Sequence, residues 1–420
     1  MFRFLPFALL ICLTALAPAY GENWPQWRGP TSNGVAPAGS YPTEWSGEEH
    51  VAWKRKLPVS GSSTPAVWGE LIFLTSAQGD ENTLLCLNRD GQPQWETKLG
   101  AMRKGKHRKA TSCNSSPVTD GQHVYAYFKS GDLACLDFDG KVIWQTNLQR
   151  EFGEDTLWWD LGTSPVLTQR HVVIAVVQTG PSYIVAFDKQ TGKLAWKRDR
   201  NLGAPVEAAQ TYATPIVVEQ DGKETLVVLG ADHVTAHDAQ DGSELWRVGG
   251  MNPKQDQYFR SISSPVSGTD IVVAPYARGS TVTAIKMGGQ GDVTQSHVAW
   301  KKEDLGADVP TPIVMGNKLY ICGDNGNRRG RLTCLELGTG EKLWELNLPR
   351  SRSSYSSSPI LAGGKLYVTR EDGVTFVVDP GETPQVVAEN RLADEFTAAT
   401  PVFTNGQILI RTFGHLYCIR

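Results

Sequence analysis

The stretch that decides the fold is "TSPVLTQRHVVIAVVQTGPSYIVAFDKQTGKLAW", residues Thr163–Trp196. It starts at a Ser-Pro pair, continues as short runs of β-branched and aromatic residues, and ends at a tryptophan. Turn residues separate the runs, and the turn "KQTGK" places glycine where a positive φ is needed. Nothing between the runs has a helical period. The stretch therefore predicts four short antiparallel strands.

The same pattern recurs along nearly the whole chain, at intervals of about 50 residues. A Ser/Thr-Pro pair followed by an apolar residue is found at Pro65, Pro117, Pro165, Pro215, Pro265, Pro312, Pro359 and Pro401. Most units close on a tryptophan, namely Trp95, Trp144, Trp196, Trp246, Trp300 and Trp344. Four-stranded units of this length, repeated around a ring, are typical of a β-propeller.

The two ends of the chain indicate how the ring closes. The anchor at Pro401 is followed by a chain end after only three predicted strands. The missing strand is "HVAWKRKL", His50–Leu57, which carries Trp53 in the closing position. Pairing the first and last strands removes two exposed sheet edges. We predict an all-β fold, a single eight-bladed β-propeller of four-stranded antiparallel blades over residues 50–420, closed by pairing of the N- and C-terminal strands.

The recurrent tryptophans and cysteines are interpreted as structural. A blade must bury both faces against its neighbours, and burying one such aromatic side chain contributes roughly 2–3 kcal/mol. The seventh unit has Val387 where the tryptophan is expected. Four cysteines share one context in successive repeats, which favours small apolar side chains over a disulfide framework: Cys86, Cys135, Cys334 and Cys418.

The first 21 residues predict a signal peptide. Met1–Arg3 is positively charged, Phe4–Ala17 is apolar, and Ala19–Gly21 has the form of a cleavage site. We therefore expect an exported protein, periplasmic or secreted, without a transmembrane segment. The net charge of −3 excludes a typical nucleic-acid-binding protein, which carries a strong basic excess. We expect a monomer.

Residues 22–49 form a separate segment ahead of the first predicted strand. It contains "NWPQWRGPTSNG", Asn23–Gly34, which is too aromatic for a flexible linker and too rich in proline and glycine for a strand. We predict an N-terminal clasp that runs over one face or rim of the propeller. Trp24 and Trp27 are expected to be mostly buried, and Arg28 is expected to cap carbonyl groups or pair with an acid.

The units Ser115–Trp144 and Ser182–Trp196 resemble the PQQ-type tryptophan-docking repeat. Such repeats build eight-bladed propellers in quinoprotein alcohol dehydrogenases and in BamB-like assembly factors. The resemblance extends from about Trp24 to the end of the chain, and it is specific for the fold rather than for an activity. It implies either a binding scaffold or a quinone-dependent oxidoreductase.

The site residues of quinoproteins distinguish these two implications. Those enzymes hold PQQ in the central channel with a Ca²⁺ ligated by Glu, Asn and Asp, and commonly place two adjacent cysteines under the cofactor. No two cysteines are adjacent here, and Val176–Val185 lacks the asparagine expected at that place. We therefore expect no catalytic, cofactor-binding or metal-ligating residues and no cofactor, with PQQ and Ca²⁺ kept as the alternative.

The loops that lead from each outer strand to the next inner strand all emerge on one face of a propeller. Here they are long, and they carry the aromatic and arginine residues that are favoured at binding sites. The candidate partner-binding residues are Arg103, His107, Arg108, Trp158, Trp159, Asp160, Tyr212, Tyr258, Arg260, Arg352 and Tyr355. We predict a non-catalytic extracytoplasmic scaffold that presents this face to a protein or extracellular polymer. The alternative is a quinoprotein-type dehydrogenase.

Overall fold

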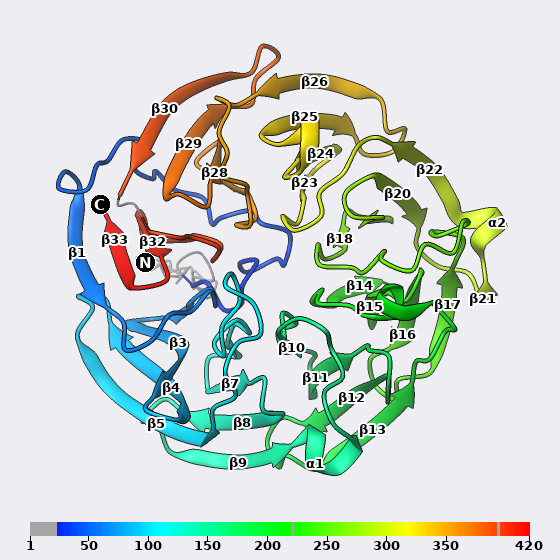
Figure 1. The fold of residues 1–420 in the computed structure, drawn as a ribbon, viewed down its shortest axis with the longest axis horizontal. Helices are drawn as coiled ribbons and strands as arrows, with labels where there is room; N and C mark the ends of the chain where they lie inside the picture. The colour runs from blue at the N-terminus through cyan, green and yellow to red at the C-terminus, as the bar shows by residue number, and fades with distance from the viewer. Residues whose placement is uncertain (1–22, 221, 393–394) are drawn as a thin grey trace, which may run out of the picture.

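The computed structural model of the chain describes residues 23–220, 222–392 and 395–420, so the predicted signal peptide lies outside the described residues. Eight antiparallel sheets stand as blades around one axis (Figure 1). Each blade contains four antiparallel strands, and one blade adds a short fifth strand in parallel. This arrangement confirms the predicted all-β, eight-bladed propeller.

The blades follow one another in chain order, each from its inner to its outer strand. Blades 1 to 4 consist of β2 (Ala66–Trp68), β3 (Leu71–Gln78), β4 (Glu81–Asn88) and β5 (Pro93–Ala101); β6 (Val118–Thr119), β7 (His123–Tyr127), β8 (Asp132–Asp137) and β9 (Val142–Asn147); β10 (Val166–Leu167), β11 (His171–Val176), β12 (Tyr183–Asp188) and β13 (Leu194–Asp199); and β14 (Ile216–Gln220), β15 (Lys223–Gly230), β16 (His233–Asp238) and β17 (Glu244–Val248), with β21 (Gly291–Asp292) beside β17.

Blades 5 to 8 consist of β18 (Val266–Ser267), β19 (Ile271–Tyr276), β20 (Thr281–Lys286) and β22 (Val298–Glu303); β23 (Ile313–Met315), β24 (Lys318–Cys322), β25 (Arg331–Glu336) and β26 (Lys342–Asn347); β27 (Ile360–Ala362), β28 (Lys365–Thr369), β29 (Val374–Asp379) and β30 (Gln385–Arg391); and β31 (Val402–Thr404), β32 (Gln407–Arg411), β33 (His415–Ile419) and β1 (Val51–Lys56). Two short helices, α1 (Leu148–Phe152) and α2 (Thr294–His297), interrupt the strands. Within the described ranges, no helix is long and apolar enough to cross a membrane.

The ring closes as predicted. Strand β1 pairs antiparallel with β33, and Trp53 lies opposite Cys418 in the register. The eighth blade therefore takes its outer strand from the beginning of the described chain and its three inner strands from the end. This pairing covers the edges that would otherwise be open to other chains.

The Ser/Thr-Pro repeat joins the inner strands through a closed circle of hydrogen bonds. Each of these Ser/Thr residues donates its backbone N–H to the side-chain oxygen of the equivalent residue in the next blade. The Ser116 N–H donates to Ser164 Oγ at 2.9 Å, for example, and Thr400 closes the circle by donating to Thr64 Oγ1 at 3.1 Å. We call these residues the hydroxyl ring: Thr64, Ser116, Ser164, Thr214, Ser264, Thr311, Ser358 and Thr400.

Removing one hydroxyl from this ring should destabilise the propeller. In Ser164→Ala the buried N–H of Ser116 loses its acceptor, which should lower the free energy of unfolding by about 1–3 kcal/mol. Ser164→Thr is the matched control, because threonine supplies the same oxygen elsewhere in the ring. Urea unfolding followed by circular dichroism measures both variants. An alanine variant as stable as the threonine variant would contradict this role for the ring.

The closing tryptophans join each outer strand to the following blade. The indole N–H of Trp95 donates to the Phe138 carbonyl at 2.8 Å, and its ring lies over Gly140. Gly140 has a φ of 83°, and a side chain there would meet the ring, so only glycine fits. Equivalent indole–carbonyl bonds are formed by Trp53, Trp144 and Trp300. The tryptophans are therefore structural, as predicted, and Val387 in blade 7 lies exposed instead.

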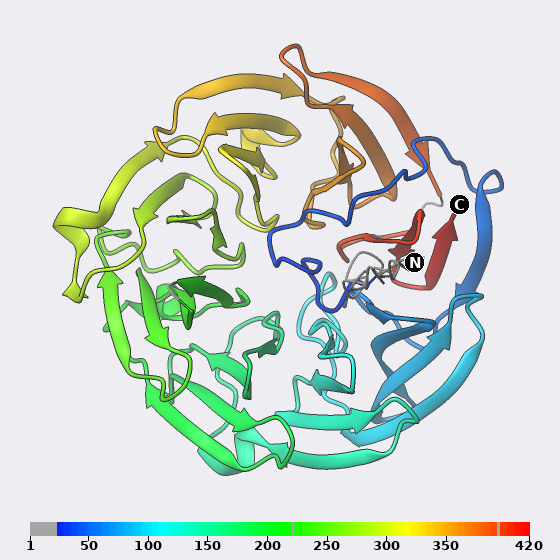
Figure 2. The same cartoon turned by 180° about the vertical axis from the view of Figure 1, so that it is seen from behind.

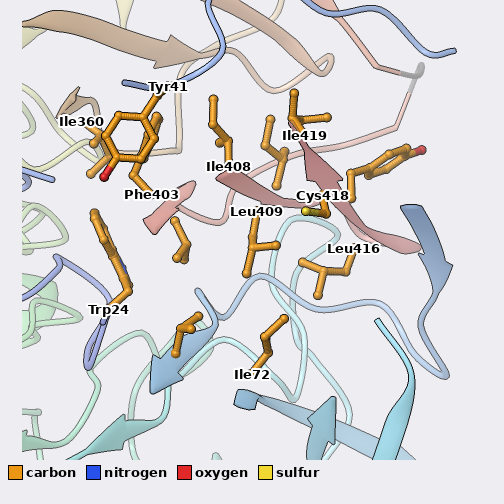
Figure 3. Packing of buried hydrophobic residues seen from close by; sticks show 14 of the residues in the cluster. Trp24, Tyr41, Ile72, Ile360, Phe403, Ile408, Leu409, Leu416, Cys418 and Ile419 are labelled. Carbon is orange, nitrogen blue, oxygen red and sulfur yellow. The ribbon is translucent and has the colours of Figure 1, made fainter. Parts of the chain in front are cut away.

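The N-terminal segment crosses the centre of the face opposite the long loops (Figure 2). Trp24 forms a bridge with Val67 of blade 1, and Val35 forms one with Leu361 of blade 7. Trp24 is fully buried in a cluster with the core of blade 8, where it packs beside Phe403 (Figure 3). The expected burial is thus confirmed: Trp24 is fully buried, and only a minor part of the Trp27 surface is exposed.

Arg28 anchors this segment between blades 6 and 7. Its buried guanidinium donates to the carbonyls of Pro312 at 2.7 Å and Pro359 at 2.9 Å, so it caps carbonyls, which was one of the two roles predicted for it. Burial lowers the pKa of Arg28 to about 9. Gly34 has a φ of 77°, and a side chain there would collide with the guanidinium. The segment therefore reaches into the centre of the ring rather than following its rim.

Candidate functional site

A cavity of about 580 Å³ lies at the centre of the propeller. All members of the hydroxyl ring except Thr311 line its wall. Trp27 also lines it, and the remaining lining residues come mainly from the long loops. Because residues 23–35 cross the ring on the opposite face, the cavity is entered from the face of the long loops, which we call the loop face.

The structure divides the predicted partner-binding residues into two groups. Six of them line the cavity: His107, Trp159, Asp160, Tyr212, Arg260 and Tyr355. The other five lie outside its lining: Arg103, Arg108, Trp158, Tyr258 and Arg352. Trp158 and Tyr258 are prominent among the second group, because 46% and 54% of their surface is exposed.

Asp160 holds the loop that follows blade 1 over the edge of the cavity. Its buried carboxylate forms an ion pair with Lys129, which is also buried. The second carboxylate oxygen accepts the backbone N–H groups of Lys106 at 2.6 Å and His107 at 3.1 Å. This carboxylate is thus fully used in positioning residues 103–109.

Glu207 organises the next part of the cavity wall. It is buried, and it accepts the indole N–H of Trp159 at 2.8 Å and a guanidinium N–H of Arg278 at 2.8 Å. Val206, which begins the short 3-10 helix Val206–Ala209, has a φ of 44°. A β-branched residue in the left-handed region is strained. The strain lies directly beside the carboxylate that fixes Trp159.

Arg260 links this wall to blade 6. It forms two parallel hydrogen bonds with Asp308, at 3.0 and 3.1 Å. The backbone N–H groups of Asp308 and Val309 in turn donate to the buried carboxylate of Asp324. Burial, followed by the neighbouring charge of Asp308, raises the pKa of Asp324 to about 7.

Lys109 connects opposite sides of the cavity mouth. Its ammonium group lies 2.8 Å from both carboxylate oxygens of Glu371 in blade 7, and the Ser356 hydroxyl donates to the same carboxylate at 2.6 Å. The loop that Asp160 holds near blade 3 therefore reaches across to blade 7. It covers part of the entrance to the cavity.

Most of the charged side chains that organise this site were not predicted from the sequence. Lys129, Arg278, Asp324 and Glu371 all lie in the hairpin between the second and third strands of their blades. An alignment of the repeats by their anchors places "FKSGD", "CGDNG" and "TREDG" at this same hairpin. A buried charge recurring at one hairpin was the signal available in the sequence.

Several acidic and amide side chains at or near the cavity are already bonded to other protein groups. In the described part of the chain, no group of three or more His, Cys, Asp or Glu residues is placed to hold a metal ion. Gln178 lies in the segment where a quinoprotein is expected to have an asparagine ligand. Its amide oxygen accepts the backbone N–H of Thr156, and its amide nitrogen donates to the carbonyls of Glu154 and Pro181. The carboxylates of Asp160 and Glu371 are already paired with lysines. The cysteines of the described residues are all buried and free.

Comparisons with known proteins agree with the architecture. The family model described as outer membrane protein assembly factor BamB matches residues 46–180 and 139–383. A comparison with curated protein sequences gave no match. Among solved structures, BamB from Moraxella catarrhalis superposes with a TM-score of 0.64 at 15% identity, over 88% of this chain and 98% of that one.

Two dehydrogenase structures are also similar. The quinohemoprotein alcohol dehydrogenase of Comamonas testosteroni gives a TM-score of 0.58 at 10% identity, over 94% of this chain and 80% of that one. A quinohemoprotein alcohol dehydrogenase of Pseudomonas putida HK5 gives 0.60 at 11% identity, over 95% and 80%. At such identities the solved structures show a shared fold alone. Because the family model matches well over half of the residues, the chain belongs to the BamB family of PQQ-repeat β-propellers.

Proposed function

We propose that this protein is an exported, non-catalytic scaffold that binds a protein partner through its loop face. The observation that carries the proposal is a group of exposed aromatic and basic side chains beside the cavity. We call it the rim surface, and it consists of Arg103, Arg108, Trp158 and Tyr258. Aromatic and arginine side chains are the types most often found at binding hot spots.

A series of side-chain contacts connects the loops beneath the rim surface across several blades. The His107 ring meets the Trp159 ring edge-on, with centroids 5.3 Å apart. Trp159 is bonded to Glu207, and Arg278 bonds both Glu207 and the carbonyl of Tyr258. A surface held in place by buried charges loses little conformational entropy when a partner binds. The name of the related assembly factor also favours a protein as the partner.

Charge reversal on the rim surface tests this proposal. Neither Arg103 nor Arg108 forms an ion pair with a described residue, so Arg103→Glu/Arg108→Glu should change stability by less than about 0.5 kcal/mol. We expect the variant to capture at least about tenfold less partner from an envelope extract of the source organism, which corresponds to 1.4 kcal/mol. Lys141→Glu/Lys193→Glu, at exposed turns of the opposite face, is the matched control. Equal losses in both variants would contradict a specific loop-face partner.

A quinone-dependent dehydrogenase is the second candidate, supported only by the fold shared with two such enzymes. The paired carboxylates of the cavity favour the scaffold instead. After incubation with PQQ and Ca²⁺ and desalting, we expect neither quinone absorbance nor alcohol-dependent dye reduction. Either signal above background would overturn the non-catalytic proposal.

A further inference from the structure

The hydroxyl ring leaves a set of buried O–H donors without acceptors. The side-chain oxygens of the ring accept N–H groups, and each retains one proton to donate. Thr64 donates this proton to the Thr400 carbonyl at 3.2 Å. For the other ring members that line the cavity, no described residue offers an acceptor within hydrogen-bonding distance. These O–H groups are therefore available to donate to water or to a ligand in the cavity.

Most of the charged side chains around the cavity are already paired with one another. Lys109 is paired with Glu371, Arg260 with Asp308, and Asp160 with Lys129. Arg329, at the exposed edge of the lining, donates to the carbonyls of Ser351 and Arg352. At the paired side chains, an anion or a cation would have to displace an existing partner, which leaves a charge uncompensated. The ligand that suits this wall is therefore neutral, with several oxygen atoms that accept and donate hydrogen bonds.

Aromatic rings supply the apolar part of the wall. Trp27 lines the cavity from the N-terminal segment, and Trp159, Tyr212 and Tyr355 line it from the loops. The volume of about 580 Å³ is typical of a small-molecule site. Neutral charge, many hydroxyl partners and flat apolar faces together describe a sugar. We propose that the cavity binds a neutral carbohydrate, a function beyond the protein-binding role of the rim surface.

A peptide fits the cavity less well. A peptide usually binds to a sheet by adding a strand to a free edge. The inner strands are short here, with only two residues in β6, and the N–H groups of Thr119 and Leu361 already bond the N-terminal segment. That segment also blocks threading of a long chain, because it crosses the ring opposite the entrance. The site therefore suits a free oligosaccharide or the end of a glycan chain.

Adjacent tryptophans give a matched pair of variants for the test. Trp159 lines the cavity and Trp158 does not, and both are more than 40% exposed, so replacing either should leave the fold intact. Maltotriose, cellotriose and triacetylchitotriose are titrated by calorimetry, with trigalacturonic acid as the anionic control. We expect at least one neutral trisaccharide to bind with one site per chain. Trp159→Ala should weaken it by about tenfold or more, and Trp158→Ala by less than about twofold.

Three results would overturn the proposal: no neutral trisaccharide binds, trigalacturonic acid or an unrelated tripeptide binds more tightly, or the two alanine variants lose affinity equally. If Trp159→Ala does not unfold cooperatively, Trp159→Phe replaces it, because phenylalanine keeps an aromatic ring but loses the bond to Glu207.

A polymer of the same sugar distinguishes a free oligosaccharide from the end of a glycan chain as the natural ligand. Its affinity is compared with that of the trisaccharide at equal concentration of chain ends. Equal affinity per chain end assigns the site to glycan ends, and weaker binding assigns it to free oligosaccharides. Loss of partner capture in the Arg103/Arg108 variant is independent of all these results.

Discussion

Asp160→Asn should lower the free energy of unfolding by about 3–5 kcal/mol, because it leaves the charge of Lys129 buried without its partner. The ammonium group would retain only the Lys104 carbonyl as an acceptor. Asparagine would also offer one oxygen where the carboxylate offers two, while the N–H groups of Lys106 and His107 still need acceptors. Thermal and urea unfolding of the purified variant measure the loss.

Removing the second charge should restore much of that stability. In Lys129→Met/Asp160→Asn no charge remains buried, and a methionine of similar length occupies the lysine's space. We therefore expect the double variant to be more stable than Asp160→Asn alone. Equal stability of the single variant and the unchanged protein would mean that water reaches the pair. The same comparison tests whether residues 103–109 depend on Asp160, since that loop should become accessible to limited proteolysis only in the single variant.

The fold was predictable because each repeat specifies its own blade. The anchors, the glycine turns and the closing tryptophans are local features, and the closure through Trp53 followed from counting strands at both ends. The physical role of the anchor hydroxyls was not predictable in this way. Ser116 and Ser164 are 48 residues apart, and their bond exists only because successive blades stand side by side. The spacing of the anchors predicts the repeat, but it does not predict which side chains of neighbouring blades contact each other.

The site was predicted only in part, for a similar reason. Aromatic and arginine residues in long loops are conspicuous, so Trp159, Tyr212 and Arg260 were selected, and all three line the cavity. The acids that hold Trp159 and Arg260 are Glu207 and Asp308, each 48 residues away in the chain. Lys109 and its partner Glu371 are 262 residues apart. Pairings of this length follow from ring geometry, which a single sequence does not encode in any local pattern.

The pairing of charges in the cavity bears on the choice between the two proposed functions. Propellers of the same architecture occur both in BamB and in quinohemoprotein dehydrogenases, so the architecture cannot decide between them. In this chain several charged side chains of the cavity are paired with one another, as Lys109 is with Glu371 and Arg260 with Asp308, whereas most O–H groups of the hydroxyl ring that line the cavity donate to no described residue. A wall of satisfied charges and unsatisfied hydroxyls favours recognition of a neutral ligand over activation of a bound cofactor.

The second large effect is expected at Trp24, whose replacement tests whether the N-terminal segment is part of the propeller. Its indole is fully buried among residues of blades 1, 7 and 8, beside Phe403, against which Tyr41 also packs (Figure 3). Trp24→Ala should therefore lower the free energy of unfolding by about 3–5 kcal/mol, the range for removing a large aromatic side chain from a core. Urea unfolding followed by circular dichroism is the appropriate measurement.

Two further variants distinguish burial from other causes. The indole N–H of Trp24 has no acceptor among the described residues, so Trp24→Phe should lose much less stability than Trp24→Ala. Trp27→Ala should also be mild, because Trp27 is partly exposed and lines the cavity instead of the core. If Trp24→Ala and Trp27→Ala were equally stable, the segment would be only loosely attached. A large loss confined to Trp24→Ala would mean that the ring is stable only with its N-terminal segment in place, and that the closed end of the cavity is a permanent feature of the fold.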